Sequence, residues 1–534
     1  MYIEPHLAPR EANFRPLSPV DFLDRAVSVF PGRKAVIWRD RSWTYGELGA
    51  MVARFSDLLQ ASGIGRGDVV SVMCSNRPEM LAAHYAVPLL GAVLNSMNTR
   101  LDDDAIAYIL DHSGTQLLIC EESCRVVASA AAARAGVPLL VLSDHATIEP
   151  EQLYLLDGET PSSRAFTADI TDEWHPIGLN YTSGTTGRPK GVVVHHRGAY
   201  LNALGNVLAL GFDPQTVYLW VLPMFHCNGW CHTWAITAAG GVHVCLDRVD
   251  PELIFGAIAQ HGVTHMSCAP VVLYMLINHP ARAHYDVQRR VNVATGGAAP
   301  TSALIAEMDA LGFNFIHLYG LTESYGPTSL RELEAEETSL ALAARASLLA
   351  QQGSRHPTSN TVRVMDEMLR EVPSDGMTVG EIVLQGNTLM AGYYRDAEAT
   401  ETVFHGGVFH TGDLAVRHPS GHIEIKDRLK DVIISGGENI SSLEVESVLH
   451  QHPGVLLAAV IAQSDPKWGE IPCAFIELKP GATTTPEELQ AFCRDKLAGF
   501  KIPRRFIFQE IPKTATGKIQ KFMLRQAASD RTGE

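Results

Sequence analysis

A segment rich in glycine and hydroxyl side chains, TSGTTGRPKG at residues 182–191, has the residue types that suit phosphate binding. Glycine lets backbone N–H groups approach an anion closely, and the hydroxyls and the ammonium of Lys190 add further donors. The segment is not a Walker loop, because the lysine of that motif precedes serine or threonine, whereas Lys190 precedes Gly191. On composition alone, a flexible turn between two strands stays open as the alternative.

A second segment, FHCNGWCH at residues 225–232, brings together histidine and cysteine, which are ligand types that zinc prefers. Structural zinc sites usually take their ligands from two separated pairs, whereas all of these would come from one short stretch. Buried thiols that line a pocket are therefore the better interpretation. The 9 cysteines of the chain are scattered and odd in number, so no disulfide framework is predicted.

Other short motifs follow one another along the chain. They are WTYGEL at residues 43–48, GGAAP at 296–300, YGLTE at 319–323, TGD at 411–413, DRLKD at 427–431, GGENI at 436–440 and PKTATGK at 512–518. With TSGTTGRPKG in its place in this series, the chain resembles the adenylate-forming superfamily of acyl-CoA synthetases, peptide-synthetase adenylation domains and luciferases. The resemblance covers most of the chain and implies an AMP-forming acyl-CoA synthetase.

This resemblance implies a nucleotide site that is built from several of the motifs. The residues implied to contact ATP are Thr182, Ser183, Gly184, Thr185, Thr186, Gly187 and Lys190 at the phosphates, Gly297, Ala298, Ala299, Tyr319 and Gly320 around the adenine, and Asp413 with Arg428 at the ribose. Thr322 would hydrogen-bond the α-phosphate, and Glu323 would bind Mg²⁺, a hard cation that prefers oxygen ligands. Taken singly, a Thr-Glu pair would indicate a helix cap and an Asp after Gly a turn.

Two lysines are implied to serve the two half-reactions. In the first, a carboxylate attacks the α-phosphate of ATP to give an acyl-adenylate and pyrophosphate; in the second, the thiol of coenzyme A displaces AMP. Lys518 matches the family's mobile catalytic lysine, which bridges carboxylate and α-phosphate oxygens. Lys430 matches the hinge about which the small domain rotates, and Gly436, Gly437 and Glu438 would line the coenzyme A channel. ATP, Mg²⁺, coenzyme A and a small carboxylic acid are the implied ligands.

The acyl pocket is implied to include PMFHCNGW at residues 223–230, with His226 as an aromatic gate, although a lone histidine is more often a core residue. The implied pocket residues are His226, Trp230, Trp234, Gly296 and Gly320. Large indoles favour a short or medium acyl chain. The FHCNGW form is similar to 3-methylmercaptopropionate-CoA ligases and plant acyl-activating enzymes. The leading predicted substrate is therefore 3-methylmercaptopropionate, in dimethylsulfoniopropionate degradation; butyrate- to hexanoate-like fatty acids and small aryl acids are the alternatives.

The elements that must position these motifs alternate between strands and helices. Residues 68–74 and 115–120 are predicted as strands, with a helix over residues 77–93 between the two. The phosphate segment follows a predicted strand end at residues 180–182 and precedes a predicted helix over residues 197–210. Such βαβ spacing indicates an α/β fold of mostly parallel sheets covered by helices.

The length of 534 residues indicates more than one domain, because single cores stop growing at roughly 250–300 residues. We predict a large N-terminal AMP- and acyl-binding domain over residues 1–426, a hinge at residues 427–431, and a small mobile α+β domain over residues 432–534 that carries the catalytic lysine. The acidic, Ala-rich residues 331–352 are predicted as a helical insertion on the surface.

Composition narrows the function classes. The net charge of −16 argues against broad nucleic-acid binding, although it does not exclude a nucleotide ligand. The longest apolar stretch, residues 126–142, is interrupted by Arg134 and Pro138, so no membrane span is predicted. We expect a cytoplasmic protein, because the N-terminus shows no secretory signal and the final RTGE is not a peroxisomal address. The resemblance leaves a homodimer open.

Rival functions within and outside the superfamily predict features that this sequence lacks. A peptide-synthetase adenylation domain would anchor an amino group with an acidic residue, which the YLWVLPMFH region at residues 218–226 does not contain, and no carrier domain follows. A light-producing oxygenase has no specific sign in the sequence. A non-catalytic nucleotide-binding protein is disfavoured, because Glu323, Asp413, Lys430 and Lys518 are all present.

Overall fold

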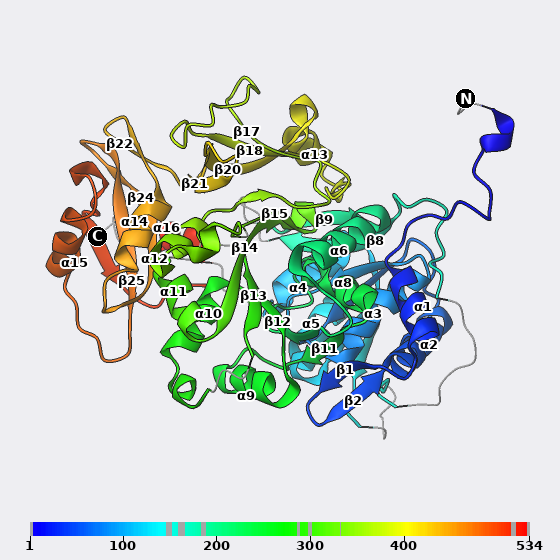
Figure 1. Cartoon of the computed structure of the whole chain (residues 1–534). Coiled ribbons are helices and arrows are strands. Elements are labelled where there is room, and N and C mark those ends of the chain that lie inside the picture. Colours follow the sequence, from blue (N-terminus) through cyan, green and yellow to red (C-terminus); the bar gives the residue numbers. More distant parts are fainter. Residues whose placement is uncertain are drawn as a thin grey trace.

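The computed structural model describes residues 4–145, 152–157, 166–182, 188–285, 289–296, 302–331, 333–513 and 519–530. In these residues the chain forms four β-sheets with helices around them (Figure 1). The two largest sheets belong to the blue-to-green part of the chain. A small antiparallel sheet lies at the top of the view, and the last sheet lies in the orange C-terminal part.

The nine-stranded sheet is parallel through its centre and antiparallel at both ends, in the order β16-β15-β14-β13-β12-β10-β11-β1-β2. Its strands are β1 (Lys34–Trp38), β2 (Arg41–Thr44), β10 (Val217–Trp220), β11 (Val242–Cys245), β12 (His265–Cys268), β13 (Val291–Thr295), β14 (Phe313–Leu321), β15 (Gly326–Arg331) and β16 (Ser354–Arg355). The inner strand β12 is buried at every residue, as expected of a parallel strand covered on both faces.

The eight-stranded sheet carries the phosphate segment at its antiparallel end, in the order β19-β9-β8-β4-β3-β5-β6-β7. Its strands are β3 (Val69–Met73), β4 (Val93–Ser96), β5 (Thr115–Glu121), β6 (Leu139–Leu142), β7 (Gln152–Leu153), β8 (Pro176–Thr182), β9 (Lys190–His195) and β19 (Gly392–Tyr393). Strands β8 and β9 pair antiparallel as a hairpin, with Thr182 at the end of β8 opposite Lys190 at the start of β9.

Helices cover the two large sheets. They are α1 (Val20–Val29), α2 (Tyr45–Ala61), α3 (Pro78–Leu89), α4 (Asp103–Ser113), α5 (Arg125–Ala135), α6 (His196–Leu210), α7 (Cys227–Trp230), α8 (His232–Ala239), α9 (Pro251–His261), α10 (Pro270–Asn278), α11 (Ser302–Ala310), α12 (Leu342–Leu349) and α13 (Ala397–Val403). Helix α2 begins with a capping box in which Thr44 and Glu47 bond each other's backbone N–H groups. Helix α3 is buried along its whole length, because its sequence is apolar on nearly every side.

The two smaller sheets follow. The four-stranded antiparallel sheet contains β17 (Thr361–Met365), β18 (Gly380–Gln385), β20 (Phe409–Arg417) and β21 (Ile423–Arg428). The five-stranded sheet contains β22 (Ile433–Ser435), β23 (Glu438–Ile440), β24 (Val455–Asp465), β25 (Gly469–Leu478) and β26 (Arg505–Phe508), with α14 (Ser442–Leu449), α15 (Pro486–Arg494) and α16 (Lys521–Asp530). The predicted hinge, residues 427–431, spans the link between β21 and β22.

The predicted α/β class with mostly parallel large sheets is confirmed. Two element predictions were wrong. The helix expected over residues 77–93 ends at Leu89, because Gly91 adopts a left-handed φ of 67° and β4 then begins at Val93. Residues 331–352 are not one surface helix. The short helix α12 packs against α11. Its Leu349 is buried, because the apolar residues of this helix face the core.

Candidate active site

The TGD motif lies on β20, and its Asp413 is the centre of a buried polar cluster. The hydroxyl of Tyr319 donates to Oδ2 of Asp413 at 2.7 Å, and Nε of Arg428 lies 3.0 Å from Oδ1. Asp413 is only 3% exposed, so the guanidinium compensates a carboxylate that would otherwise be costly to bury. Burial and the nearby Asp413 charge raise the pKa of Tyr319 well above its usual value, which keeps its hydroxyl a donor.

Glu381 of β18 supports this motif, although no sequence pattern indicates it. The backbone N–H of Gly412 donates to one Glu381 oxygen at 2.8 Å, and Nδ1 of His410 lies 2.7 Å from the other. These bonds fix the left-handed turn at Gly412, whose φ is 71°, immediately before Asp413. The contact depends on the antiparallel register of β18 with β20, which no local motif encodes.

Thr322 and Glu323 form a short 3₁₀ turn at the end of β14. The hydroxyl of Tyr393 donates to Oε1 of Glu323 at 2.8 Å, and burial raises the pKa of Tyr393. The backbone N–H of Met390 donates to the carbonyl of Glu323 at 2.7 Å, so the turn is held from two directions. A carboxylate fixed in this way offers oxygen ligands that fit Mg²⁺. Tyr393 is a site residue that the sequence interpretation missed.

Lys190 begins β9 at the base of the phosphate hairpin. Its Nζ lies 3.6 Å from Oδ2 of Asp396 and 4.9 Å from the centre of the Tyr393 ring. These contacts hold the Lys190 ammonium beside Asp396 and Tyr393, and its predicted contact with phosphate stays a prediction. Beside it, the hydroxyl of Tyr181 lies 2.7 Å from Nδ1 of His112, which anchors the other strand of the hairpin.

Several predicted site residues lie outside the described residues. They are Ser183, Gly184, Thr185, Thr186, Gly187, Gly297, Ala298, Ala299 and Lys518. Of the predicted channel residues, Gly436 and Gly437 form the tight turn between β22 and β23, with positive φ values of 61° and 89°. A Cβ at Gly436 would lie 2.9 Å from the Trp468 ring, so a tight turn accounts for that glycine locally. Glu438 and Lys430 are both exposed.

The segment after His226 turns in the left-handed sense. Residues 227–231, including the glycine, have φ values between 49° and 62°. Each non-glycine residue in this conformation costs roughly 1–2 kcal/mol, so neighbouring groups must hold it. Nδ2 of Asn180 donates to Oδ1 of Asn228 at 2.9 Å, and Oγ1 of Thr233 donates to the carbonyl of Asn228 at 3.1 Å. We call residues 227–231 the left-handed turn.

The left-handed turn directs Trp230 against three glycines. A Cβ at Gly326 would lie 3.0 Å from Cβ of Trp230, and one at Gly296 would lie 3.2 Å from Cη2 of its indole. A Cβ at Gly320 would lie 1.8 Å from the carbonyl oxygen of Gly326, so this neighbourhood excludes side chains at all three positions. Gly296, Gly320 and Trp230, all predicted pocket residues, are therefore brought together, with Gly326 as a further member.

The left-handed turn also connects the predicted gate to the predicted phosphate contact. The thiol of Cys227 donates to Oγ1 of Thr322 at 3.2 Å, and its Sγ lies 3.7 Å from Nε2 of His226. Cys227 is 4% exposed. The acyl-side segment and the turn that carries Glu323 are therefore in direct contact.

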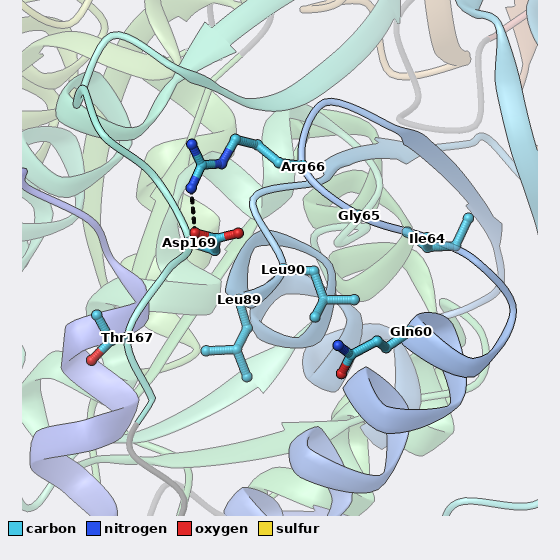
Figure 2. A pocket seen from close by; sticks show the side chains of 8 residues that line it. All are labelled: Gln60, Ile64, Gly65, Arg66, Leu89, Leu90, Thr167 and Asp169. Atoms are coloured by element: carbon cyan, nitrogen blue, oxygen red, sulfur yellow. Dashed lines mark hydrogen bonds and ion pairs between the residues drawn. The ribbon is translucent and has the colours of Figure 1, made fainter.

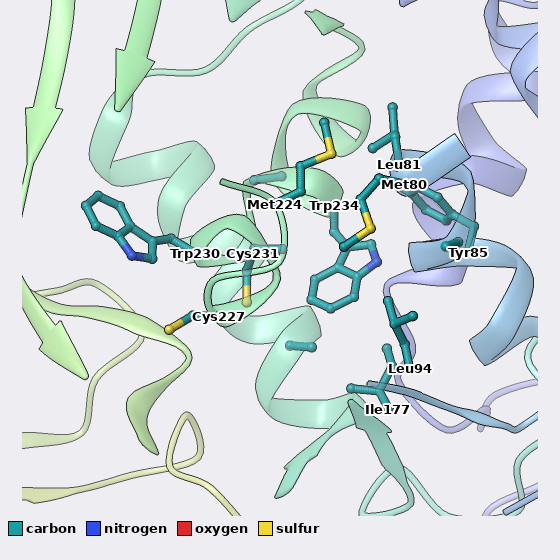
Figure 3. Close-up of a cluster of buried hydrophobic side chains, with 14 of the residues drawn as sticks. Met80, Leu81, Tyr85, Leu94, Ile177, Met224, Cys227, Trp230, Cys231 and Trp234 are labelled. Atoms are coloured by element: carbon teal, nitrogen blue, oxygen red, sulfur yellow. The ribbon is translucent and has the colours of Figure 1, made fainter. Parts of the chain in front are cut away.

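The prediction that Trp234 lines the same pocket as Trp230 does not fit the structure. Figure 3 shows the two indoles on opposite sides of Cys231, with Trp234 among Met80, Tyr85 and Leu94. The indole N–H of Trp234 donates to the carbonyl of His84 at 3.0 Å, and the side chain is 1% exposed. Trp234 is a core residue. The backbone changes direction at residues 227–231, so the side chains of Trp230 and Trp234 do not lie on one helix face.

The zinc interpretation of residues 225–232 finds no support among the described residues, which contain no cluster of three metal-ligating side chains. Cys231 donates to the carbonyl of Tyr325, while Nδ1 of His232 lies 3.0 Å from the hydroxyl of Tyr218. The side chains of Cys231 and His232 thus bond to different partners and do not converge on one point. All 9 cysteines are buried and free of disulfides.

A surface cavity of about 310 Å³ lies elsewhere, between the ends of α2 and α3 (Figure 2). It is lined by Gln60, Ile64, Gly65, Arg66, Leu89, Leu90, Thr167 and Asp169. None of these is a predicted site residue, and Arg66 is paired with Asp169 across the opening. The motif cluster is therefore the better candidate for the active site.

Residues 23–394 match the family described as AMP-binding enzyme, and residues 444–518 match the AMP-binding enzyme C-terminal domain. This chain belongs to the AMP-binding enzyme family. An acetate–CoA ligase of Humulus lupulus is 42% identical over 97% of this chain and 96% of its own length. An acetate/butyrate–CoA ligase of Arabidopsis thaliana, named as peroxisomal, is likewise 42% identical over 97% of this chain and 96% of its own length.

Solved structures share the fold of this AMP-binding enzyme. The anthranilate CoA ligase AuaEII in complex with anthranoyl-AMP superposes with a TM-score of 0.86 at 23% identity, over 98% of this chain and 100% of that one. ATP-bound MatB from Rhodopseudomonas palustris superposes with a TM-score of 0.82 at 25% identity, over 96% of this chain and 99% of that one. The chain is an AMP-forming acid–CoA ligase that uses ATP, Mg²⁺ and coenzyme A. No described helix is long and apolar enough to cross a membrane.

Proposed function

We propose that this acid–CoA ligase activates a short aliphatic acid and transfers it to coenzyme A. The observation that carries the proposal is the Trp230 indole, which lies against Gly296 and Gly326 where the acyl chain is expected. A bulky ring in that position shortens a pocket. The relatives named as acetate– and acetate/butyrate–CoA ligases support the same size of acid.

The specific acid is a finer proposal. 3-Methylmercaptopropionate is an unbranched acid with a backbone close in length to pentanoate, and the FHCNGW form favours it. Butyrate-like acids are the alternative, which relatives named as acetate/butyrate– and butyrate–CoA ligases favour. Small aryl acids fit less well, because a flat ring would have to share the space beside the Trp230 indole.

In the proposed first half-reaction, a carboxylate oxygen forms a bond to the α-phosphorus of ATP and pyrophosphate leaves. Asp413, held by Tyr319 and Arg428, would accept hydrogen bonds from the ribose hydroxyls. The hydroxyl of Thr322 would donate a hydrogen bond to an α-phosphate oxygen and accept one from the thiol of Cys227. The ammonium of Lys518 would bridge the two anions. Mg²⁺ at Glu323 would neutralise phosphate charge.

In the proposed second half-reaction, the sulfur of coenzyme A bonds to the acyl carbon, its proton is lost and AMP leaves. We propose that rotation of residues 432–534 about Lys430 replaces Lys518 with the turn at Gly436 and Gly437. Lys430 is exposed in the link between β21 and β22, as a hinge residue should be. Lys430→Pro should spare acid-dependent pyrophosphate release and block thioester formation; a variant with a normal overall rate would refute the hinge.

The substrate proposal is tested with a panel of acetate, butyrate, 3-methylmercaptopropionate, hexanoate, octanoate and benzoate. Acid-dependent pyrophosphate release and coenzyme A-dependent thioester formation are measured for each acid. We expect kcat/KM to be highest between butyrate and 3-methylmercaptopropionate, and to be lower for octanoate by about tenfold or more. Highest activity with octanoate or benzoate would overturn the proposal. Pyrophosphate release without any thioester would instead favour loading of a carrier protein.

A cytoplasmic location and a homodimeric assembly are separate proposals. The cytoplasmic location follows only from the sequence, and the Arabidopsis relative is named as peroxisomal. Fluorescent fusions at either end of the chain, imaged with an organelle marker, would test the location. Light scattering of the purified full chain would distinguish a dimer from a monomer.

A further inference from the structure

Two buried asparagines of α6 connect both sides of the glycine-lined space around Trp230. Nδ2 of Asn206 donates to the carbonyl oxygen of Trp230 at 2.8 Å and to Oδ1 of Asn202 at 2.8 Å. Nδ2 of Asn202 in turn donates to the carbonyl oxygen of Pro327 at 3.4 Å, next to Gly326. Asn202 is 0% exposed and Asn206 is 1% exposed. The two are four residues apart on one face of the helix.

The orientation of both amides follows from their partners. The carbonyl oxygens of Trp230 and Pro327, at the two ends of this chain of bonds, can only accept. Asn202 must therefore direct its amino group toward Pro327 and its oxygen toward Asn206, which must donate. Unlike an isolated surface asparagine, neither side chain can flip without placing two acceptors against each other.

The bond to Trp230 matters because its backbone is strained. Trp230 has a φ of 55°, in the middle of the left-handed turn. A bulky non-glycine residue keeps such a conformation only where the surroundings impose it. The donor on Asn206 satisfies the buried carbonyl in this conformation, and the start of the Trp230 side chain packs closely on Gly326. A hydrogen bond from α6 thus helps to set the position of the ring.

We infer that Asn206 is a positioning residue for acyl-chain length, which acts by holding Trp230 against Gly326, with Asn202 one bond further away. The inference rests on the proposed function, in which Trp230 closes the acyl pocket. Asn206 lies on the helix that follows the phosphate hairpin, so it also ties the position of the pocket wall to the element next to the nucleotide site.

The test compares Asn206→Leu with the wild type, using hexanoate and butyrate. Leucine keeps the branched shape and the number of non-hydrogen atoms of the side chain and removes the donor. We expect the ratio of kcat/KM for hexanoate over butyrate to rise by about tenfold, because a displaced indole admits a longer chain. The KM for ATP should stay unchanged. Asn202→Leu should shift the ratio in the same direction by less. Asn206→Ser carries the same test if Asn206→Leu does not fold.

Asn95→Leu is the matched control. Asn95 is also 1% exposed and donates to Oγ of Ser71 at 2.7 Å, inside the eight-stranded sheet. It should lose a similar amount of thermal stability with an unchanged hexanoate/butyrate ratio. An equal shift in this control would show a general loosening of the fold and overturn the inference.

A double-mutant cycle with Trp230→Gly distinguishes the inferred role of Asn206 from the proposed role of Trp230 as the acyl wall. If Asn206 acts through the indole, Asn206→Leu should have no further effect on the ratio in the Trp230→Gly background. Independent, additive shifts would overturn the inference, as would an unchanged ratio in Asn206→Leu when Trp230→Gly changes it. If Trp230→Gly itself leaves the ratio unchanged, the proposed acyl wall is wrong, and the inference fails with it for that distinct reason.

Discussion

The ribose side and the acyl side of the candidate site are held by different forces. Around Asp413, a buried carboxylate is fixed by a phenol and a guanidinium, and its turn by Glu381. Around Trp230, a strained backbone places a bulky ring into space left by glycines. We expect the first region to select by charge and hydrogen bonds, which suit a ligand that never varies. We expect the second to select by shape, which a small change of backbone can alter.

The largest expected effect is a loss of activity that concerns both the nucleotide and the acid. Lys518→Ala removes the donor proposed to bridge the acid and the α-phosphate, so acid-dependent pyrophosphate exchange should fall by about 10²–10³-fold for every acid. Thioester formation from supplied acyl-adenylate should survive. An equal loss in both assays would contradict the assignment of Lys518 to the first half-reaction.

A substitution on the ribose side should affect all acids equally. Asp413→Asn removes the charge that compensates Arg428 and weakens the acceptor for the ribose hydroxyls. We expect kcat/KM for ATP to fall by about 10²-fold, because hydrogen bonds to a charged acceptor contribute about 1.5–3 kcal/mol and the neutral amide is a weaker acceptor. The hexanoate/butyrate ratio should not change. A changed ratio would show that the two regions are coupled more tightly than their contacts indicate.

Acid should destabilise the acyl side through His232, which follows the left-handed turn. Burial, with smaller effects of His265 and His356, lowers the pKa of His232 to about 3. The unfolded chain therefore binds more protons below pH 6.5, so this contribution to stability is complete above pH 6.5 and is lost as the pH falls toward the folded pKa.

At pH 5 this loss amounts to about 2 kcal/mol for a single histidine whose ordinary pKa is about 6.5. Denaturant unfolding of the wild type and of His232→Gln, measured between pH 7 and pH 5, tests this expectation. The variant should be less stable at pH 7 and show a shallower decline. Parallel declines would mean that His232 contributes no acid sensitivity. Exposed His6 offers a control, since His6→Gln should leave the slope unchanged.

The smallest expected effect is confined to the acyl side. Trp230→Gly should raise the hexanoate/butyrate ratio of kcat/KM by about tenfold, because the removed indole admits additional methylenes. The KM for ATP should be unchanged, since Asp413 is held by Tyr319 and Arg428 and not by the indole. Trp234→Phe is the matched control. It alters a core indole and should lower Tm without a change in the ratio.

Much of the site could be predicted from local strings of residues. Thr322 and Glu323 are adjacent in the sequence, as are the members of TGD, so their shared position required no knowledge of the fold. The strand before the phosphate segment and the helix after it also follow from apolar periodicity, and β8 and α6 lie close to where they were expected, whereas β9 was not predicted. The roles of these residues stay predictions, and those of Lys518 and of residues 183–187 fall outside the described residues.

The supporting contacts could not be predicted in this way. Tyr393 meets Glu323 across 70 residues of sequence, and Glu381 meets Gly412 through the register of two antiparallel strands. Single-sequence patterns carry no information on such pairs, because each partner is locally an ordinary tyrosine or glutamate.

The amino-acid sequence alone was sufficient for the reaction class and for the α/β architecture, because phosphate chemistry and strand–helix alternation are both written in short, contiguous patterns. The tertiary structure decided which of two nearby tryptophans faces the acyl space. Trp230 and Trp234 lie one helical turn apart in sequence, and a regular helix would have put both on one face. The left-handed turn sends Trp230 toward Gly326 and Trp234 into the core instead, and only buried partners such as Asn206 make that backbone stable.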